Sequence, residues 1–204
     1  MLRIGNGSVR TIIGLMYYTE QDMLNCLQVL HAGGILQFST EYGCCLGCDA
    51  TQEKAVDALR GYLPKSAAST FPVLLAEERD VLQWVAAADL LVFDFAVEQP
   101  KPTAILFEHG LGFASNLPAP DGSVLIFLTR DAFCRHLVKR FRKPIVAAPF
   151  DPKGFQNAQP EQTSVELPIM QSPVTRQEVL HSAMPHNLQV LYWNKGNPVV
   201  EEYL

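Results

Sequence analysis

The sequence predicts a single α/β domain, in which helices flank a twisted mixed β-sheet. The chain has 204 residues, which fits one domain of ordinary size. Apolar residues make up 48% and charged residues 18%, so the chain can form a core and is too weakly charged to be disordered. Segments with helical spacing alternate with short β-type runs, a pattern typical of α/β domains.

The first predicted unit is a helix followed by a strand. Thr19 is expected to cap the helix, because its hydroxyl can accept a hydrogen bond from the first turn, where an acid also lies. Gly33 and Gly34 end the helix, and residues 35–38 form a short strand that leads into a polar turn at residues 39–41. The apolar stripe of the helix consists of Met23, Leu24, Leu27 and Leu30.

Helices and strands continue to alternate through the middle of the chain. Asp49 or Thr51 is expected to cap a second helix, which Gly61 and Pro64 end. Further helices are predicted over residues 77–88 and 130–141. Further strands are predicted over residues 71–76, 90–95, 103–107, 124–129 and 144–148.

The C-terminal part is predicted to complete the same sheet, so that residues 1–204 form one domain. Residues 151–162 are polar and contain prolines, which predicts a surface linker. After this linker the sequence predicts a strand near Val165, a helix that begins at Thr175, and a strand over residues 188–192.

Composition also indicates the cellular compartment of the protein and the classes of partner that it can bind. No run approaches the roughly 18 apolar residues of a membrane span, and residues 1–10 lack the apolar core of a signal peptide. Five cysteines, an odd number, suit a reducing compartment. These features predict a cytoplasmic protein with no membrane partner. The net charge of −5 argues against a generally basic, nucleic-acid-binding surface.

Cys45 and Cys48 have the Cys-x-x-Cys spacing of half a zinc ribbon or of a redox dithiol. A structural zinc needs two further ligands, and the chain has no second Cys-x-x-Cys pair, so no metal site is predicted. A redox pair would be expected at the start of a helix, which lowers the thiol pKa. The glycine-bounded turn expected here, with Asp49 beside it, stabilises a thiolate poorly, which favours small thiols that pack a tight loop.

Without its cysteines, the stretch from Gly33 to Thr51 has a second pattern: Gly-Gly, a β-type run, Ser-Thr-Glu, and then Leu-Gly-Cys-Asp-Ala before a helix. It resembles the N-terminal signature of the YrdC/Sua5 family, and Pro100–Thr103 resembles a proline-rich turn of the same family. The resemblance implies a YrdC-like fold. The residues that match the signature in register are Gly33, Gly34, Ile35, Thr40, Glu41, Leu46, Gly47, Asp49 and Ala50.

Family members join L-threonine, bicarbonate and ATP into threonylcarbamoyl-adenylate, for tRNA modification. The resemblance therefore implies that Thr40 and Glu41 bind substrate, that Lys65 meets a phosphate, and that ATP with Mg²⁺ enters as substrate, with no resident cofactor. Each residue also has a purely structural interpretation. Thr40 could be a turn hydroxyl, Glu41 an acid near a helix start, and Lys65 a solvated loop lysine.

The departures from the family pattern affect the groups that would hold ATP. A Lys-Gly-Arg-Pro phosphate motif is reduced to residues 63–66, Phe127 replaces an arginine, and residues 148–154 replace a serine-rich nucleotide loop. Loss of one well-placed donor costs about a hundredfold to a thousandfold in rate. Two hypotheses follow: a synthase with little activity, or a non-catalytic relative that binds a nucleotide, another small ligand or double-stranded RNA.

The segment from Arg130 to Lys143 is strongly basic. On a helix, Arg135, Lys139 and Arg142 share one face, because they are spaced at i, i+4 and i+7. This face could contact RNA phosphates, although no interleaved aromatic residues support the recognition of bases. The alternative is a solvated helix face.

Overall fold

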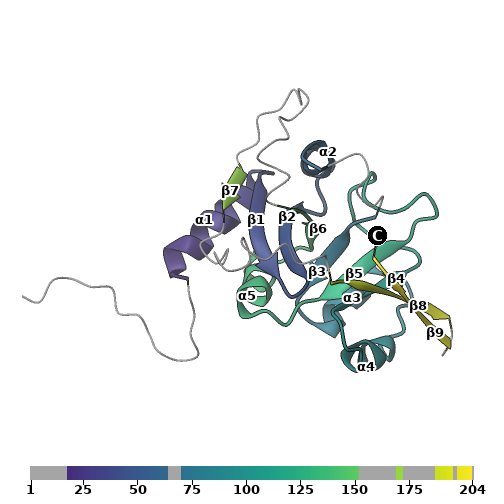
Figure 1. Cartoon of the computed structure of the whole chain (residues 1–204). Coiled ribbons are helices and arrows are strands. Elements are labelled where there is room, and N and C mark those ends of the chain that lie inside the picture. The colour runs from purple at the N-terminus through teal and green to yellow at the C-terminus, as the bar shows by residue number, and fades with distance from the viewer. Residues whose placement is uncertain (1–17, 64–69, 152–168, 172–186, 195–196, 204) are drawn as a thin grey trace, which may run out of the picture.

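The fold is an open nine-stranded mixed sheet in a computed structural model that describes residues 18–63, 70–151, 169–171, 187–194 and 197–203 (Figure 1). The order of the strands is β7-β1-β2-β6-β3-β5-β4-β8-β9. Three neighbouring pairs are parallel, β7 with β1, β3 with β5, and β4 with β8, and the other neighbours are antiparallel. The strands are β1 (Ile35–Thr40), β2 (Gly43–Asp49), β3 (Pro72–Leu75), β4 (Thr103–Phe107), β5 (Val124–Leu128), β6 (Ile145–Pro149), β7 (Ile169–Gln171), β8 (Gln189–Asn194) and β9 (Asn197–Glu202).

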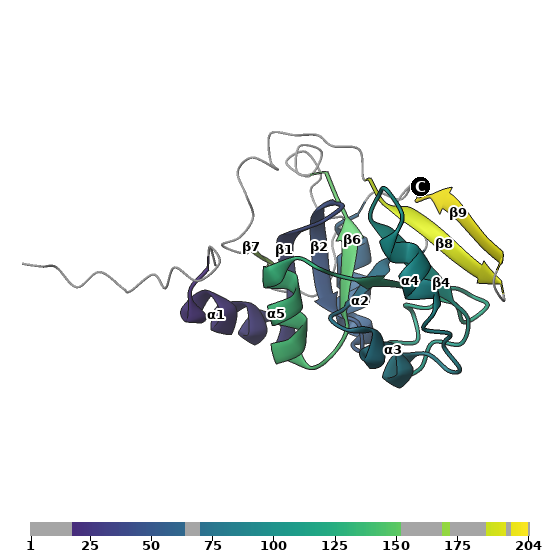
Figure 2. The same cartoon turned by 90° about the horizontal axis from the view of Figure 1, so that it is seen from below.

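Five helices of the described chain flank the sheet, and the buried side chains form two core clusters. The first core cluster joins one set of strand residues to α1 and α5, which lie side by side in both views (Figure 2). The second core cluster joins the alternate strand residues to α2, α3 and α4. The helices are α1 (Glu20–His31), α2 (Glu53–Gly61), α3 (Glu78–Trp84), α4 (Val92–Val97) and α5 (Ala132–Phe141).

The start of α1 confirms the predicted cap. The Thr19 hydroxyl accepts a hydrogen bond from the backbone N–H of Asp22, and the Asp22 carboxylate accepts one from the backbone N–H of Thr19, so the two residues form a capping box. The predicted apolar stripe is correct except for Leu24, which is 43% exposed. Cys26 is buried in its place, because the inner face of α1 turns toward α5.

The cysteine-rich stretch is a strand and not the predicted loop. Ser39 and Thr40 still belong to β1, the chain turns at residues 41–42, and β2 then runs antiparallel to β1. β2 lies between β1 and β6 and is buried along nearly all its length, so small residues such as glycine and cysteine suit it. Periodicity missed this strand because its glycines and cysteines give no apolar alternation.

The geometry of a strand separates the two cysteines of the Cys-x-x-Cys pair. Cys45 is fully buried in the first core cluster, whereas Cys48 is fully buried in the second, on the other face of the sheet. Burial raises the pKa of both thiols well above the ordinary value. The pair therefore cannot share a metal ion or close a disulfide.

Three other predicted elements need correction. Residues 90–95, predicted as a strand, belong largely to α4, because Leu91 is 68% exposed while Val92 and Phe93 are buried, which is not the alternation of a strand. Helix α3 ends at Trp84, and Val85 forms a bridge with Gly110 instead. The N-cap of α2 is Gln52, and Asp49 binds residues that precede this helix.

Some predictions fall outside the described residues. These are the strand near Val165, the helix at Thr175, Lys65, and the linker at residues 151–162 apart from Asp151 itself. The predicted strands over residues 71–76, 103–107, 124–129, 144–148 and 188–192 correspond to β3, β4, β5, β6 and β8. β7 and β9 were not predicted. No helix of the described chain is long and apolar enough to cross a membrane.

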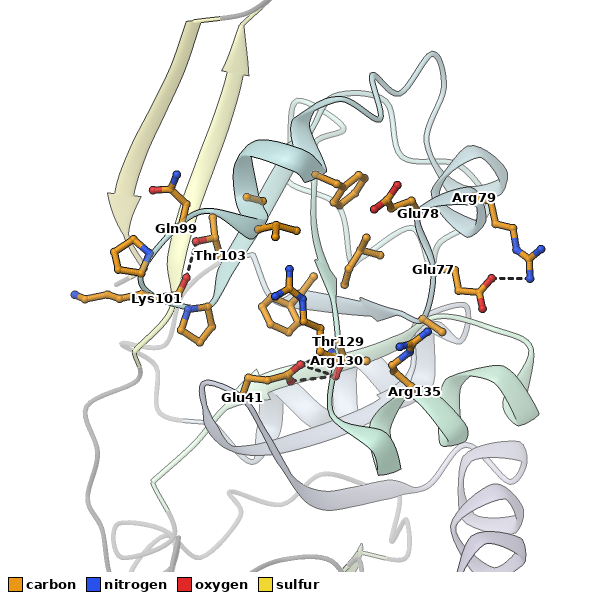
Figure 3. Close-up of a pocket in the computed structure, with 18 residues that line it drawn as sticks. Glu41, Glu77, Glu78, Arg79, Gln99, Lys101, Thr103, Thr129, Arg130 and Arg135 are labelled. Carbon is orange, nitrogen blue, oxygen red and sulfur yellow. Dashed lines mark hydrogen bonds and ion pairs between the residues drawn. The ribbon is translucent and has the colours of Figure 1, made fainter. Parts of the chain in front are cut away.

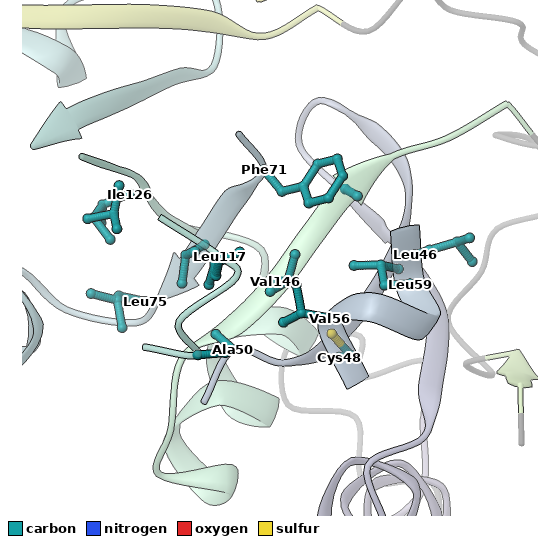
Figure 4. Packing of buried hydrophobic residues seen from close by; sticks show 14 of the residues in the cluster. Leu46, Cys48, Ala50, Val56, Leu59, Phe71, Leu75, Leu117, Ile126 and Val146 are labelled. Carbon is teal, nitrogen blue, oxygen red and sulfur yellow. The ribbon is translucent and has the colours of Figure 1, made fainter. Parts of the chain in front are cut away.

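The second core cluster holds β2 against α2 (Figure 4). Leu46 and Cys48 of β2 and Val56 and Leu59 of α2 are all fully buried in it. Gly47 lies between Leu46 and Cys48, and the ring of Phe38 lies where a Cβ of this residue would be. The family-like Leu-Gly-Cys-Asp segment is therefore part of the packed centre of the sheet.

Asp49 is the last residue of β2. Its side chain links the segment that leads into α2 to the turn between α5 and β6. Its side chain is fully buried and accepts hydrogen bonds from Lys143 Nζ at 2.7 Å, Thr51 Oγ1 at 2.6 Å and Gln52 Nε2 at 2.9 Å. Burial alone would raise the pKa of Asp49, but the hydrogen bonds from Lys143, Thr51 and Gln52 outweigh burial and lower the pKa below its usual value. Folding therefore depends on the ionised carboxylate.

The Asp49→Asn variant is expected to lose about 2 kcal/mol of unfolding free energy at pH 7, because Lys143 loses its anionic partner. A lowered folded-state pKa gives stability that is present above the unfolded aspartate pKa of about 3.9 and is lost as the pH falls through the folded value. The deficit of the variant should therefore shrink below about pH 4. Urea denaturation at pH 7 and pH 3 measures it.

Asp94→Asn is the matched control for this prediction, because Asp94 is exposed on α4 and has no partner within the described chain. It should show a small deficit that is similar at both pH values. A deficit of Asp49→Asn that stays constant from pH 7 to pH 3 would contradict the role assigned to the carboxylate.

Candidate functional site

The candidate site lies where two parallel strands end. β3 and β5 run side by side, with Leu75 opposite Leu128, and the backbone N–H of Thr129 donates to the Leu75 carbonyl at 3.1 Å. After β3 the chain turns into α3, and after β5 it turns into α5. The carboxyl ends of adjacent parallel strands commonly border the ligand site in open α/β sheets.

A cavity of about 640 Å³ opens at these strand ends (Figure 3). This volume is large enough for a small organic ligand. The start of α3, the turn that precedes β4 and the start of α5 surround it. Its lining residues are Glu41, Ala76, Glu77, Glu78, Arg79, Phe93, Ala96, Val97, Gln99, Pro100, Lys101, Pro102, Thr103, Phe127, Leu128, Thr129, Arg130 and Arg135.

Glu41 reaches from the β1–β2 turn to the start of α5. One carboxylate oxygen accepts hydrogen bonds from the backbone N–H groups of Arg130 and Asp131, the latter at 3.0 Å. The hydroxyl of Thr129, which is 2% exposed, lies 3.1 and 3.0 Å from the two carboxylate oxygens (Figure 3). A carboxylate of the chain thus occupies the backbone N–H groups of the N-cap and of the residue before it, at the positive end of α5.

The cations of the cavity fall into two groups. Arg79 is paired with Glu77 at 2.5 Å, and Lys101 is paired with Glu202 at 2.6 Å. The guanidinium groups of Arg130 and Arg135 have no hydrogen-bond or ion-pair partner in the part of the chain that the structure describes. Arg130 directly precedes the N-cap of α5 and Arg135 lies in its first turns, so both side chains reach the cavity from the start of this helix (Figure 3).

Of the three residues predicted to bind a small ligand, Thr40 and Glu41 lie within the described part of the chain. Only one of them borders the cavity. Glu41 lines the cavity. Thr40 is not among the lining residues, and its hydroxyl donates to the Gly43 carbonyl at 3.1 Å and lies 3.4 Å from Cys45 Sγ, inside the β1–β2 hairpin. The roles in substrate binding that the resemblance implies for Thr40, Glu41 and Lys65 stay predictions.

The three residues of the predicted basic face do not form one surface. Arg135 lines the cavity, whereas Lys139 forms an ion pair with Glu77. Arg142 lies beyond the last turn of α5 with φ of 60°, so it is not on the helix face, and it borders a second, smaller cavity. Neighbouring cations are also paired, Arg140 with Glu20 and Lys143 with Asp49. A contact of this face with RNA stays a prediction.

Thr129, Arg130 and Glu77 were not predicted as site residues, although the sequence contains a signal for them. Glu77 and Arg130 directly follow segments that were predicted as strands, and Thr129 is the last residue of one of these segments. Had β3 and β5 been recognised as parallel neighbours, their first polar residues would have been placed at one sheet edge. Among the described residues, no cluster of His, Cys, Asp and Glu could hold a metal ion.

An open mixed sheet with flanking helices and a cavity at the ends of parallel strands defines an α/β domain of the YrdC-like fold. The chain belongs to the Sua5/YciO/YrdC family, because the model of that family, described as "Telomere recombination", matches residues 28–184. No curated protein is significantly similar in sequence.

Solved structures support the fold. E. coli YciO has a TM-score of 0.63 at 10% identity, over 89% of this chain and 88% of that chain. P. abyssi Sua5 complexed with L-threonine has a TM-score of 0.66 at 13% identity, over 89% and 54%. Full-length HypF in the phosphate- and nucleotide-bound form has a TM-score of 0.65 at 16% identity, over 88% and 28%. The chain thus spans about half of the Sua5 chain, and identities this low establish the fold alone.

Proposed function

We propose that this protein binds a nucleotide through a phosphate group in the cavity at the ends of β3 and β5. The observation that carries the proposal is the pair of guanidinium groups, on Arg130 and Arg135, that have no partner in the described chain and border a cavity of about 640 Å³. Guanidinium groups bind phosphate oxygens through charge-assisted hydrogen bonds. The phosphate- and nucleotide-bound form of HypF supports this ligand class.

The apolar part of the lining supports a nucleotide over a simple inorganic anion. Phe93, Phe127 and Val97 line the cavity together with Gln99 and the prolines of the 100–102 turn. An apolar wall with a few polar groups is typical of sites for organic ligands, because the wall buries the body of the ligand while the polar groups orient it. Any Mg²⁺ would arrive with the nucleotide phosphates, as part of the substrate.

We propose binding without rapid synthesis of threonylcarbamoyl-adenylate. The Thr40 hydroxyl is engaged within its own hairpin, and the Glu41 carboxylate occupies the backbone N–H donors at the start of α5. Donors of this kind stabilise the negative charge that develops on the phosphoryl oxygens during adenylyl transfer. With these groups occupied and the family's phosphate motif altered, little catalytic stabilisation is left.

Titration calorimetry with AMP and with ATP tests the proposal. Arg130→Gln and Arg135→Gln should each weaken nucleotide binding about tenfold, because each removes one charge-assisted contact with phosphate. Lys54→Gln removes an equal charge from an exposed lysine of α2 that has no partner within the described chain, and it should bind like the wild type. The effect of the arginine variants should shrink at high salt.

Absence of binding heat with both nucleotides would overturn the proposed function. A second assay separates binding from synthesis by measuring the release of pyrophosphate from ATP in the presence of L-threonine and bicarbonate. We expect no release above background. Release that requires L-threonine would instead identify the chain as an active synthase. If RNA bound in a mobility-shift assay while both nucleotides failed to bind, RNA would replace the nucleotide as the ligand.

A further inference from the structure

Glu77 lies at the boundary between the candidate site and a neighbouring cavity. Its carboxylate forms ion pairs with Arg79, at 2.5 Å, and with Lys139 of α5. Glu77 and Arg79 line both the 640 Å³ cavity and a smaller one of about 280 Å³ between α3 and the end of α5. The Glu77 side chain is 24% exposed, whereas those of Arg79 and Lys139 are 80% and 46% exposed.

These ion pairs limit the positive charge that the cavity presents to a ligand. Four cationic and three acidic side chains line it. Arg79 and Lys101 are paired with acids, so Arg130 and Arg135 are the cationic side chains of the lining that have no partner in the described chain. Because Glu41 and Glu78 add negative charge to the same cavity, these two arginines suffice at most for the dianion of one phosphate monoester and fall short of the four negative charges of a free triphosphate.

The position of the acidic side chains in the lining also favours a single phosphate over a triphosphate. Glu77, Glu78 and Arg79 line the cavity at the start of α3 (Figure 3), so a second or third phosphate that extends in this direction from Arg130 and Arg135 would meet two carboxylates. Glu78 has no partner in the described chain and adds a further negative charge there. Like charges at such separations repel, and the repulsion is stronger in a cavity than in open solvent.

We propose that Glu77 is a specificity-determining residue, which pairs with Arg79 and thereby restricts the cavity to ligands that carry a single phosphate group. This inference rests on the proposed function and narrows its ligand class, from nucleotides in general to nucleoside monophosphates and comparable monoesters. Neutralising Glu77 removes one repulsive charge and releases Arg79 toward the cavity. The site then accommodates a polyphosphate.

Titration calorimetry with AMP and with Mg²⁺-free ATP, on the full chain, tests this inference. The wild type should bind AMP at least as tightly as ATP. Glu77→Gln keeps the shape of the side chain and removes its charge, so it should raise ATP affinity about tenfold and AMP affinity less than threefold. Thermal melts should show that the variant is folded, because the Glu77 side chain makes no N-cap hydrogen bond to α3.

Two matched variants separate the release of Arg79 from the loss of a negative charge. Glu78→Gln removes the same charge one residue away without breaking an ion pair, so its gain in ATP affinity should be about threefold or less. Adding Arg79→Gln to Glu77→Gln should reverse most of the gain in ATP affinity. In the wild-type background, Arg79→Gln should change ATP affinity much less, because that arginine is already neutralised.

The possible outcomes distinguish the two proposals. If the wild type binds ATP more than tenfold more tightly than AMP, or if Glu77→Gln and Glu78→Gln shift both ligands equally, the specificity role of Glu77 is wrong while nucleotide binding stands. If neither nucleotide binds to any variant, the proposed function itself fails, and this inference fails with it. A selective gain for ATP in Glu77→Gln that depends on Arg79 supports the inference.

Discussion

Gly47→Ala is expected to lower the free energy of unfolding by about 4 kcal/mol. A Cβ at this position would meet the backbone oxygen of Val146 at 2.4 Å and the ring of Phe38 at 2.5 Å. The oxygen belongs to β6, which pairs with β2 at this register, and Phe38 is fully buried in the first core cluster. The Val146 oxygen cannot move without separating β2 from β6, and the Phe38 ring is packed on all sides, so the substitution strains the centre of the sheet.

Urea denaturation of the wild type and the variant measures this effect. Gly122→Ala is the matched control, because a Cβ there meets nothing within 4 Å, although its φ of +82° adds a backbone cost of about 1 kcal/mol. The difference between the two variants isolates the steric clash. A loss at Gly47 no larger than that at Gly122 would show that β2 and β6 can separate easily.

Glu41→Ala is expected to lower the free energy of unfolding by about 3 kcal/mol. The substitution leaves the Thr129 hydroxyl and the N–H groups of Arg130 and Asp131 without their acceptor. The Thr129 side chain is buried, so water cannot fully replace the carboxylate there. Favourable interaction of the negative charge with the start of α5 is lost as well.

Glu41→Gln retains an oxygen acceptor and loses the charge, so its stability should fall between those of the wild type and the alanine variant. Glu78→Gln, which removes an exposed acid without a partner in the described chain, should change stability by less than about 0.5 kcal/mol. Thermal and urea unfolding measure all three variants. If Glu41→Ala were as stable as Glu78→Gln, the carboxylate would not hold α5 in solution.

The fold followed from the sequence where the side chains have a clear period or a specific cap. The capping box at Thr19 and the apolar runs that became β4 and β5 are signals of this kind. β2 has no such period, because it consists largely of glycines and cysteines. Gly43, Gly47 and the three cysteines are small enough to pack closely between the two core clusters, but they do not alternate with polar residues. The family resemblance matched Leu46, Gly47 and Asp49 of this strand to a known signature, which periodicity alone could not do.

Only the part of the candidate site that is contiguous in the sequence could be predicted, because the rest is assembled by the pairing of strands. Glu41 was predicted because it belongs to a contiguous motif, and it lines the cavity, while its role in binding stays a prediction. Arg130 and Glu77 become site residues only when β3 and β5 pair in parallel, which a sequence without an alignment does not specify. Arg135 and Lys139 shared a predicted face, but tertiary packing set Lys139 opposite Glu77 and left Arg135 beside the cavity, with no partner among the described residues.

The burial of every cysteine gives the molecule a set of native conformational reporters. None of the five cysteines forms a disulfide and all are buried, so an alkylating reagent meets them only when the surrounding structure opens. Cys26, Cys45 and Cys134 belong to the first core cluster, and Cys44 and Cys48 belong to the second. The labelling rates of the thiols in one core cluster therefore measure how often that face of the sheet opens. The rates in the other cluster measure the opposite face, and no engineered probe is needed.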